Sequence, residues 1–120
     1  MAKLAHIDSA VVEDAKLTDY LLALHHPRGA AKARFLMSFG FSQDRPEALR
    51  AAFLAHARQA EVVASQDTDF GTIPEIEGPP PSPDGRNPAV RAVWFLDTGA
   101  VAPRLITMVP RTGGRKGRKE

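Results

Sequence analysis

Cysteine is missing from the 120 residues of this chain. Its absence excludes disulfide bonds, thiolate zinc sites and a catalytic thiol. Long apolar runs are missing too: none approaches the roughly 20 residues that cross a bilayer. Residues 1–8 also lack the apolar core of a signal peptide. These absences predict a protein with no membrane segment, and we expect it in the cytoplasm.

The usual catalytic and cofactor signatures are absent as well. No segment matches a phosphate-binding glycine loop, a dinucleotide fingerprint, a nucleophile elbow or the ligand spacing of a zinc site. His25 and His26 are adjacent and point in different directions, which makes them a poor metal clamp. We therefore expect neither a metal nor a cofactor.

Positive charge is concentrated at the C-terminus. Residues 111–120 carry a net charge of +4 and the whole chain +2, so residues 1–110 carry −2. Within that body, residues 28–58 hold six Lys or Arg against two acids, whereas residues 61–84 hold six acids and no base. This segregation predicts one basic and one acidic surface, which favours an oriented partner over a uniformly cationic binder.

Three helices are expected in the first half of the chain, over residues 18–24, 29–39 and 46–59. Thr18 is a suitable N-cap, Gly40 a suitable stop, and Pro46 a suitable first-turn residue. The side chains that helical spacing turns toward a core are Leu17, Leu21 and Leu24, then Phe35, Leu36 and Phe39, then Leu49, Ala52, Phe53, His56 and Ala57.

Strands are expected in the second half, over residues 61–66, 72–77, 90–96 and 105–109. Because it contains Pro74, the second segment is predicted to be an edge strand or a distorted strand. The third segment is apolar on both faces, which is typical of a central strand. The pattern predicts an α+β domain over residues 15–110, with two or three helices packed on an antiparallel sheet of about four strands. An N-terminal arm over 1–14 and a disordered basic tail over 111–120 complete the chain.

The remaining candidate functional side chains are of types that bind and act on phosphate groups. Metal-free RNA cleavage needs one group to deprotonate a 2′-hydroxyl, another to protonate the leaving oxygen, and cations to stabilise the phosphate charge. Histidine suits the proton transfers and arginine the charge. The group comprises His26, Arg28, Lys32, Arg34, His56, Arg86, Arg91, Arg104 and Thr107.

Each of these residues also has a structural explanation. His56 can be a hydrogen-bonded core histidine, and Lys32 can lay its methylenes over the aromatic face of its helix. Arg91 and Arg104 can pair with the acids of the first two strands. The segment 83–86 can simply form a turn.

Several motifs together carry a resemblance to a known family. They are Lys16-Leu17-Thr18-Asp19-Tyr20-Leu21-Leu22, His26-Pro27-Arg28-Gly29, Lys32-Ala33-Arg34-Phe35, Gly40-Phe41, Pro83-Asp84-Gly85-Arg86, Val90-Arg91-Ala92-Val93-Trp94 and Pro103-Arg104-Leu105-Ile106-Thr107. Through them, residues 15–110 resemble an uncharacterised bacterial family, a domain of unknown function.

The helices-then-sheet layout of that family is similar to the compact RNase fold of barnase, EndoU, colicin RNases and RelE-type toxins. This likeness implies metal-free RNA cleavage and a small neutralising partner protein. It implies His26, Lys32, Arg91 and Thr107 as catalytic positions, with Arg28, Arg34, His56, Arg86 and Arg104 as substrate-binding ones. The chain departs from the pattern after Thr107, where we expect an aromatic hydroxyl and find Met108-Val109-Pro110.

The sequence leaves three functions open. The first is a metal-independent, ribonuclease-like module of the toxin type that acts on RNA. The second is a non-catalytic module that binds a partner protein through its segregated charged faces. The third is non-specific nucleic-acid binding by the basic tail, which the −2 charge of residues 1–110 disfavours.

Overall fold

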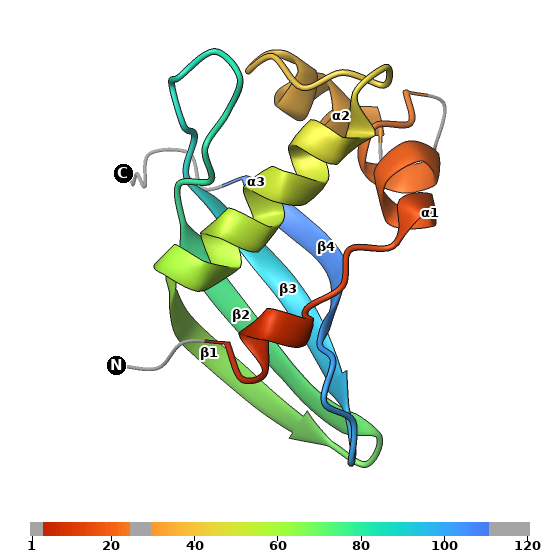
Figure 1. Cartoon of the computed structure of the whole chain (residues 1–120), viewed down its shortest axis with the longest axis vertical. Coiled ribbons are helices and arrows are strands. Elements are labelled where there is room, and N and C mark those ends of the chain that lie inside the picture. Colours follow the sequence, from red (N-terminus) through yellow and green to blue (C-terminus); the bar gives the residue numbers. More distant parts are fainter. Residues whose placement is uncertain (1–3, 25–29, 111–120) are drawn as a thin grey trace.

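The computed structural model describes residues 4–24 and 30–110, and it shows an α+β fold (Figure 1). The helices come first: α1 (Asp14–Lys16) runs into a π-helical turn (Leu17–Leu21), and α2 (Ala30–Met37) and α3 (Pro46–Gln59) follow. The strands are β1 (Glu61–Thr68), β2 (Gly71–Gly78), β3 (Val90–Asp97) and β4 (Arg104–Pro110). They form one antiparallel sheet in chain order. The predicted fold class is confirmed.

The hydrophobic core lies between α3 and one face of the sheet. The sheet contributes Ile76, Ala92 and Trp94, and α3 contributes Phe53, all 0% exposed and all part of one cluster. Figure 1 shows α3 crossing that face obliquely. The expected core stripe of the third helix is confirmed in full, since Leu49, Ala52, Phe53, His56 and Ala57 are its buried residues.

The first helix begins four residues earlier than the sequence predicts. Its N-cap is Glu13 in an extended conformation, so the prediction that Thr18 caps it is wrong: the Thr18 hydroxyl donates to Asp14 O at 3.1 Å from inside the helix. The π-turn, closed by Leu22 N to Leu17 O at 2.9 Å, shifts the buried face. Leu22 is therefore buried and Leu24 is 40% exposed, because the wider turn brings residues five apart onto one side.

Gly40 ends α2 as predicted. The amide of Phe41 donates to Leu36 O at 3.3 Å and that of Gly40 to Met37 O at 3.0 Å, the two bonds of a Schellman cap. Gly40 has φ +100°, a conformation that glycine adopts without a side-chain penalty. Phe41 and Leu36, which this cap brings together, are both buried.

Strand β2 is an interior strand, so the prediction of an edge strand at Pro74 is wrong. Pro74 pairs with Ser65 of β1, but the β2–β3 register passes from Thr72–Leu96 directly to Glu75–Val93. A proline that cannot donate is tolerated because the ladder skips its position. The alternative of a distorted strand is the correct one, and the predicted hairpin of β3 and β4 is confirmed.

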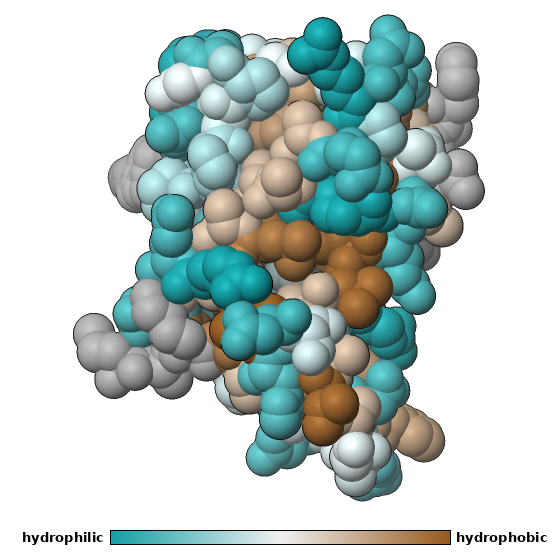
Figure 2. Space-filling model, viewed as in Figure 1, coloured by the Kyte–Doolittle hydropathy of each residue, from teal (hydrophilic) through white to brown (hydrophobic). Residues whose placement is uncertain are grey.

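The N-terminal segment packs onto the domain. Val11 forms a parallel bridge with Arg104 at the β4 edge, and Leu4 and Val12 are each 3% exposed within the common core. An open groove of about 470 Å³ remains between this segment and α3, lined by residues that include Val11, Val12 and Leu54. Figure 2 shows hydrophobic atoms gathered at the centre of this face of the molecule. Among the described residues, no helix has the length and apolar character needed to cross a membrane.

Candidate functional site

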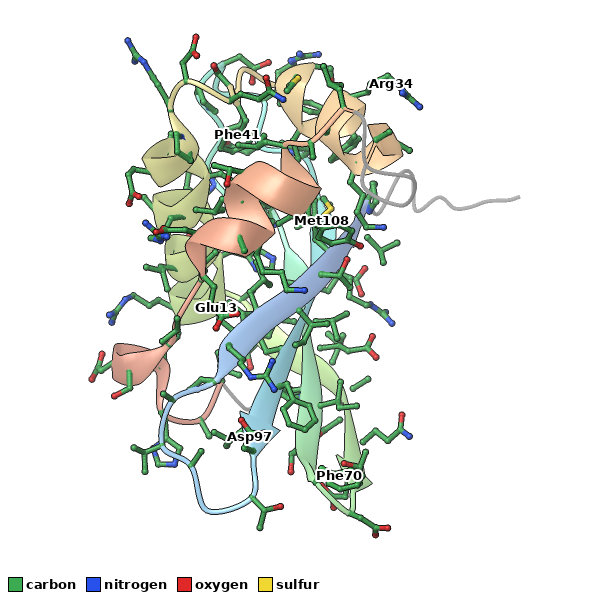
Figure 3. All side chains as sticks on the ribbon, turned by 90° about the vertical axis from the view of Figure 1, so that its right-hand side faces the viewer. Glu13, Arg34, Phe41, Phe70, Asp97 and Met108 are labelled. Carbon is green, nitrogen blue, oxygen red and sulfur yellow. The ribbon has the colours of Figure 1, made fainter. Side chains whose placement is uncertain are left out.

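The face of the sheet that points away from α3, here called the open face, carries the charged and polar side chains of the strands. Strand alternation turns Trp94 and Ile76 inward, so Glu75, Glu77, Arg91 and Thr107 point outward. The described helices lie elsewhere: α3 against the opposite face, and α1 and α2 along β4 (Figures 1 and 3). The open face is therefore the surface on which the strand residues can meet a ligand.

Arg91 lies at the centre of a cluster on this face. Its guanidinium nitrogens are 3.2 Å from Glu75 Oε1 and 2.8 Å from Glu77 Oε1, and Glu77 is its direct cross-strand neighbour. The hydrogen bond to Glu77 is the main reason that the pKa of Arg91 is raised above its ordinary value. The cross-strand pairing that we considered as its structural explanation is the arrangement found.

Thr107 lies beside this cluster and is hydrogen-bonded to a tyrosine. Its Oγ1 is 2.9 Å from the Tyr20 hydroxyl, across 87 residues of chain. Thr107 pairs with Val93, two residues along β3 from Arg91, so Thr107 and Arg91 occupy neighbouring rows of one face. Lys16 Nζ lies 5.3 Å from the centroid of the Tyr20 ring. Tyr20 thus provides a phenolic hydroxyl next to Thr107, although it comes from the first helix and not from the end of β4.

Sequence reasoning did not select Tyr20 as a site residue. It stands in the motif of residues 16–22, but helix periodicity gives no reason to place it beside the last strand. One feature of the sequence did point to it. The aromatic hydroxyl expected after Thr107 is missing from β4, and a residue of another element can supply such a hydroxyl.

His56 is separate from this cluster, on the α3 side of the sheet. It is 1% exposed, and its Nε2 lies 3.0 Å from Gly78 O. Burial lowers the pKa of His56, only partly opposed by the carbonyls of Gly78 and Val90, so the imidazole is neutral near pH 7. A cavity of about 340 Å³ adjoins it, with Glu61 and Glu77 in its lining. Among the described residues, no three His, Cys, Asp or Glu side chains are grouped so that they could hold a metal ion.

Arg86 binds the loop between β2 and β3 to the end of α2. It donates to Asp84 and to Ser38 O, and its guanidinium lies 4.4 Å from the centroid of the Phe39 ring. The amide of Asp84 also donates to Phe39 O at 3.2 Å. The predicted turn at 83–86 therefore holds Arg86 in intramolecular contacts.

The other predicted residues lie apart from Arg91. Arg104 is 3.6 Å from Asp97 and 5.2 Å from the Phe95 ring centroid, farther along the open face. Lys32 is half-buried on α2, and Arg34 is exposed and points away from the sheet (Figure 3). His26 and Arg28 lie outside the described residues. Of the predicted catalytic positions, the structure brings Arg91 and Thr107 together.

A family model described as a domain of unknown function, DUF6883, matches residues 3–112. The chain belongs to this family. The resemblance seen in the sequence motifs is thereby confirmed. No curated protein matches the sequence.

The fold is similar to that of a chain from Klebsiella pneumoniae 342, in a contact-dependent growth inhibition toxin–immunity protein complex. The similarity covers 88% of this chain and 96% of that one, with a TM-score of 0.67 and 18% sequence identity. At this identity the likeness shows a shared fold.

Packing explains many of the motif residues of this DUF6883 chain. Leu17, Leu22 and Trp94 are fully buried in the core, and Gly40 and Arg86 shape the loops around α2. The motif residues Tyr20, Arg91 and Thr107 instead carry polar groups on or beside the open face. Their polar contacts are not needed to fill the core, which makes them the candidates for function.

Proposed function

We propose that this chain is a metal-independent ribonuclease of the toxin type, with its site on the open face around Arg91 and Thr107. The observation that carries the proposal is the arrangement of a guanidinium, two carboxylates and a pair of hydroxyls on one sheet surface that the described helices leave uncovered. The shared fold with a chain of a toxin–immunity complex supports the toxin type. Action on RNA in the cytoplasm and a small neutralising partner protein belong to the same proposal.

Each group in this arrangement has a role in transesterification at a phosphate. A carboxylate of Glu75 or Glu77 accepts the proton of the attacking 2′-hydroxyl. The Arg91 guanidinium stabilises the charge that develops on the phosphate oxygens, and the hydroxyls of Tyr20 and Thr107 donate to the same oxygens. His26 stays the predicted donor of a proton to the leaving 5′-oxygen, and Lys32 a predicted second cation.

Digestion of total bacterial RNA in the presence of EDTA tests the proposal. We expect the wild type to cleave and Thr107→Val, which keeps the shape of the side chain, to cleave more slowly. We expect Arg91→Lys to lower the rate by about 10²-fold, because lysine keeps the charge but loses the planar fork. A His26→Ala/Lys32→Ala double variant should lose cleavage as well.

Arg58→Ala is the matched control. Arg58 lies on α3, on the opposite side of the sheet, and pairs with Asp8 at 2.9 Å. It should cleave like the wild type. Equal rates for the wild type, Arg91→Lys and Thr107→Val would overturn the site, and no cleavage by the wild type at high enzyme concentration would overturn the activity.

A non-catalytic module that binds a partner protein is the second candidate, and one observation favours it. Arg91 is already neutralised by two glutamates, as expected for a cross-strand pair that only stabilises the sheet. An immunity-type role is compatible with the same fold likeness, which comes from a complex of two proteins. If this second function is correct, the chain has no catalytic turnover and forms a complex with its partner protein that weakens with added salt.

A further inference from the structure

The hairpin turns at one end of the sheet display apolar side chains to solvent. Phe70, in the β1–β2 turn, is 78% exposed, and Val101, in the β3–β4 connection, is 62% exposed. The amide of Thr98 donates to Phe70 O at 3.0 Å, so the two turns are joined. Figure 3 shows Phe70 and Asp97 at this same end. We call the segments 67–71 and 97–103 the hairpin tip.

The backbone that carries Phe70 is held by hydrogen bonds. Thr68 Oγ1 accepts from the amides of Phe70 and Gly71, each at 3.1 Å, and donates to Gly71 O at 2.8 Å. Gly71 packs so closely on β3 that an added Cβ would lie 2.3 Å from Leu96 O. Because the turn is already ordered, little conformational entropy remains to be lost when Phe70 binds a partner.

The open face also carries apolar side chains near the tip. Phe95 and Ile73 point outward on β3 and β2 and are half-buried. These two half-buried side chains lie near the same end of the sheet as Phe70 and Val101, so apolar side chains gather at this end. Aromatic residues are enriched in protein interfaces, so an exposed phenylalanine here is a suitable anchor.

The charge around the tip is negative. Asp67, Asp69 and Asp97 are exposed there, and Arg104 lies 3.6 Å from Asp97. Three carboxylates against one guanidinium repel a phosphate backbone and an anionic membrane. The same charges attract lysine and arginine, so the charge around the tip fits a basic protein surface.

We propose that the hairpin tip is a docking surface for a partner protein that presents an apolar pocket rimmed by lysine and arginine. Phe70 fills the pocket, Val101 packs beside it, and the three aspartates pair with the rim. The proposal does not depend on ribonuclease activity, since it uses none of the side chains assigned to cleavage.

Selection of a phage-displayed random 12-residue peptide library on the full-length protein, with counter-selection on Phe70→Ser, tests this surface. Enriched peptides should combine aliphatic or aromatic residues with Lys or Arg. Fluorescence anisotropy with a synthetic copy should show at least about tenfold weaker binding to Phe70→Ser and to a second variant, Val101→Ser. Asp69→Asn should weaken binding severalfold, and so should 300 mM salt relative to 50 mM.

Val63→Ser is the matched control, because Val63 is a 49%-exposed valine of β1 outside the tip. It should bind like the wild type. Peptides that bind Phe70→Ser and the wild type equally, that lack basic residues, or that fail to enrich at all would each overturn the proposal. Sedimentation showing a Phe70-dependent dimer would overturn it too, since a second copy would then be the occupant.

Discussion

The imidazole of His56 connects the end of α3 to the end of β2 through its contact with Gly78 O. Around it the packing is close: a Cβ added at Gly78 would lie 3.0 Å from Ala60 Cβ and 3.8 Å from His56 Nε2. A buried neutral imidazole is stable there because one ring nitrogen donates to a carbonyl. A protonated ring would carry a charge into the core, which is unfavourable.

The pH dependence of folding should therefore report on His56. Burial lowers its folded-state pKa below the ordinary 6.5. As the pH falls through 6.5, the imidazole therefore takes up a proton more readily in the unfolded chain than in the folded one. We expect this group to lower the free energy of unfolding as the pH falls, by at most about 1.4 kcal/mol per pH unit, in urea titrations between pH 7.5 and 5.5.

His56→Gln should remove this share of the pH dependence, because glutamine can keep the hydrogen bond to Gly78 O but does not titrate. His6→Gln, at an exposed position, is the control and should follow the wild type. Parallel stability curves for the wild type and His56→Gln would show that His56 does not contribute.

The burial of a residue could be predicted where helical periodicity determines it. A contact between segments far apart in the sequence could not. Helical spacing alone turns His56 toward the core, but its partner Gly78 is 22 residues away. Tyr20 and Thr107 are 87 residues apart. Such a contact depends on how the first helix lies against β4, which no local pattern contains.

The observed secondary-structure elements agree with the predicted ones where the sequence has strong start and stop signals. Pro46 and a regular apolar stripe define α3, and the glycine cap defines the end of α2. The first helix differs because its π-turn breaks the 3.6-residue period on which the prediction rests. Strand β2 differs because a skipped ladder position accommodates Pro74 inside the sheet.

The turn between β1 and β2 should tolerate no side chain at Gly71. An added Cβ would lie 2.3 Å from Leu96 O and 2.9 Å from Asp97 Cα, both backbone atoms that cannot move without shifting β3. We expect Gly71→Ala to lower the free energy of unfolding by about 3 kcal/mol, at the upper end of overpacking effects, as measured by urea titration.

Gly99→Ala provides the comparison within the same tip. Gly99 has φ +81°, and an added Cβ there meets nothing within 4 Å. We expect Gly99→Ala to lower the free energy of unfolding by only roughly 1 kcal/mol, which is the cost of a left-handed conformation for a residue with a side chain. Equal losses at the two positions would mean that the close approach of β2 and β3 at Gly71 is not a constraint.

At the scale of the whole molecule, the N-terminal segment and the sheet form one folded unit. Arg50 on α3 donates to Val12 O at 2.9 Å and pairs with Asp14 and Glu47. Val11 is hydrogen bonded to the β4 edge through Pro103 O and the amide of Leu105. This role could not be predicted, because residues 1–13 show no periodic pattern.

Two truncations should therefore have different effects on stability. Removal of residues 1–13 deletes the buried side chains of Leu4 and Val12 and uncovers the core that they close. Each is worth about 1.5–3 kcal/mol, so the free energy of unfolding should fall by about 3 kcal/mol or more. Removal of residues 111–120, the basic tail that the sequence predicts to be unpacked, should change it by less than about 0.5 kcal/mol. Thermal and urea unfolding of both truncations beside the full chain measure the difference, and equal losses from the two ends would contradict it.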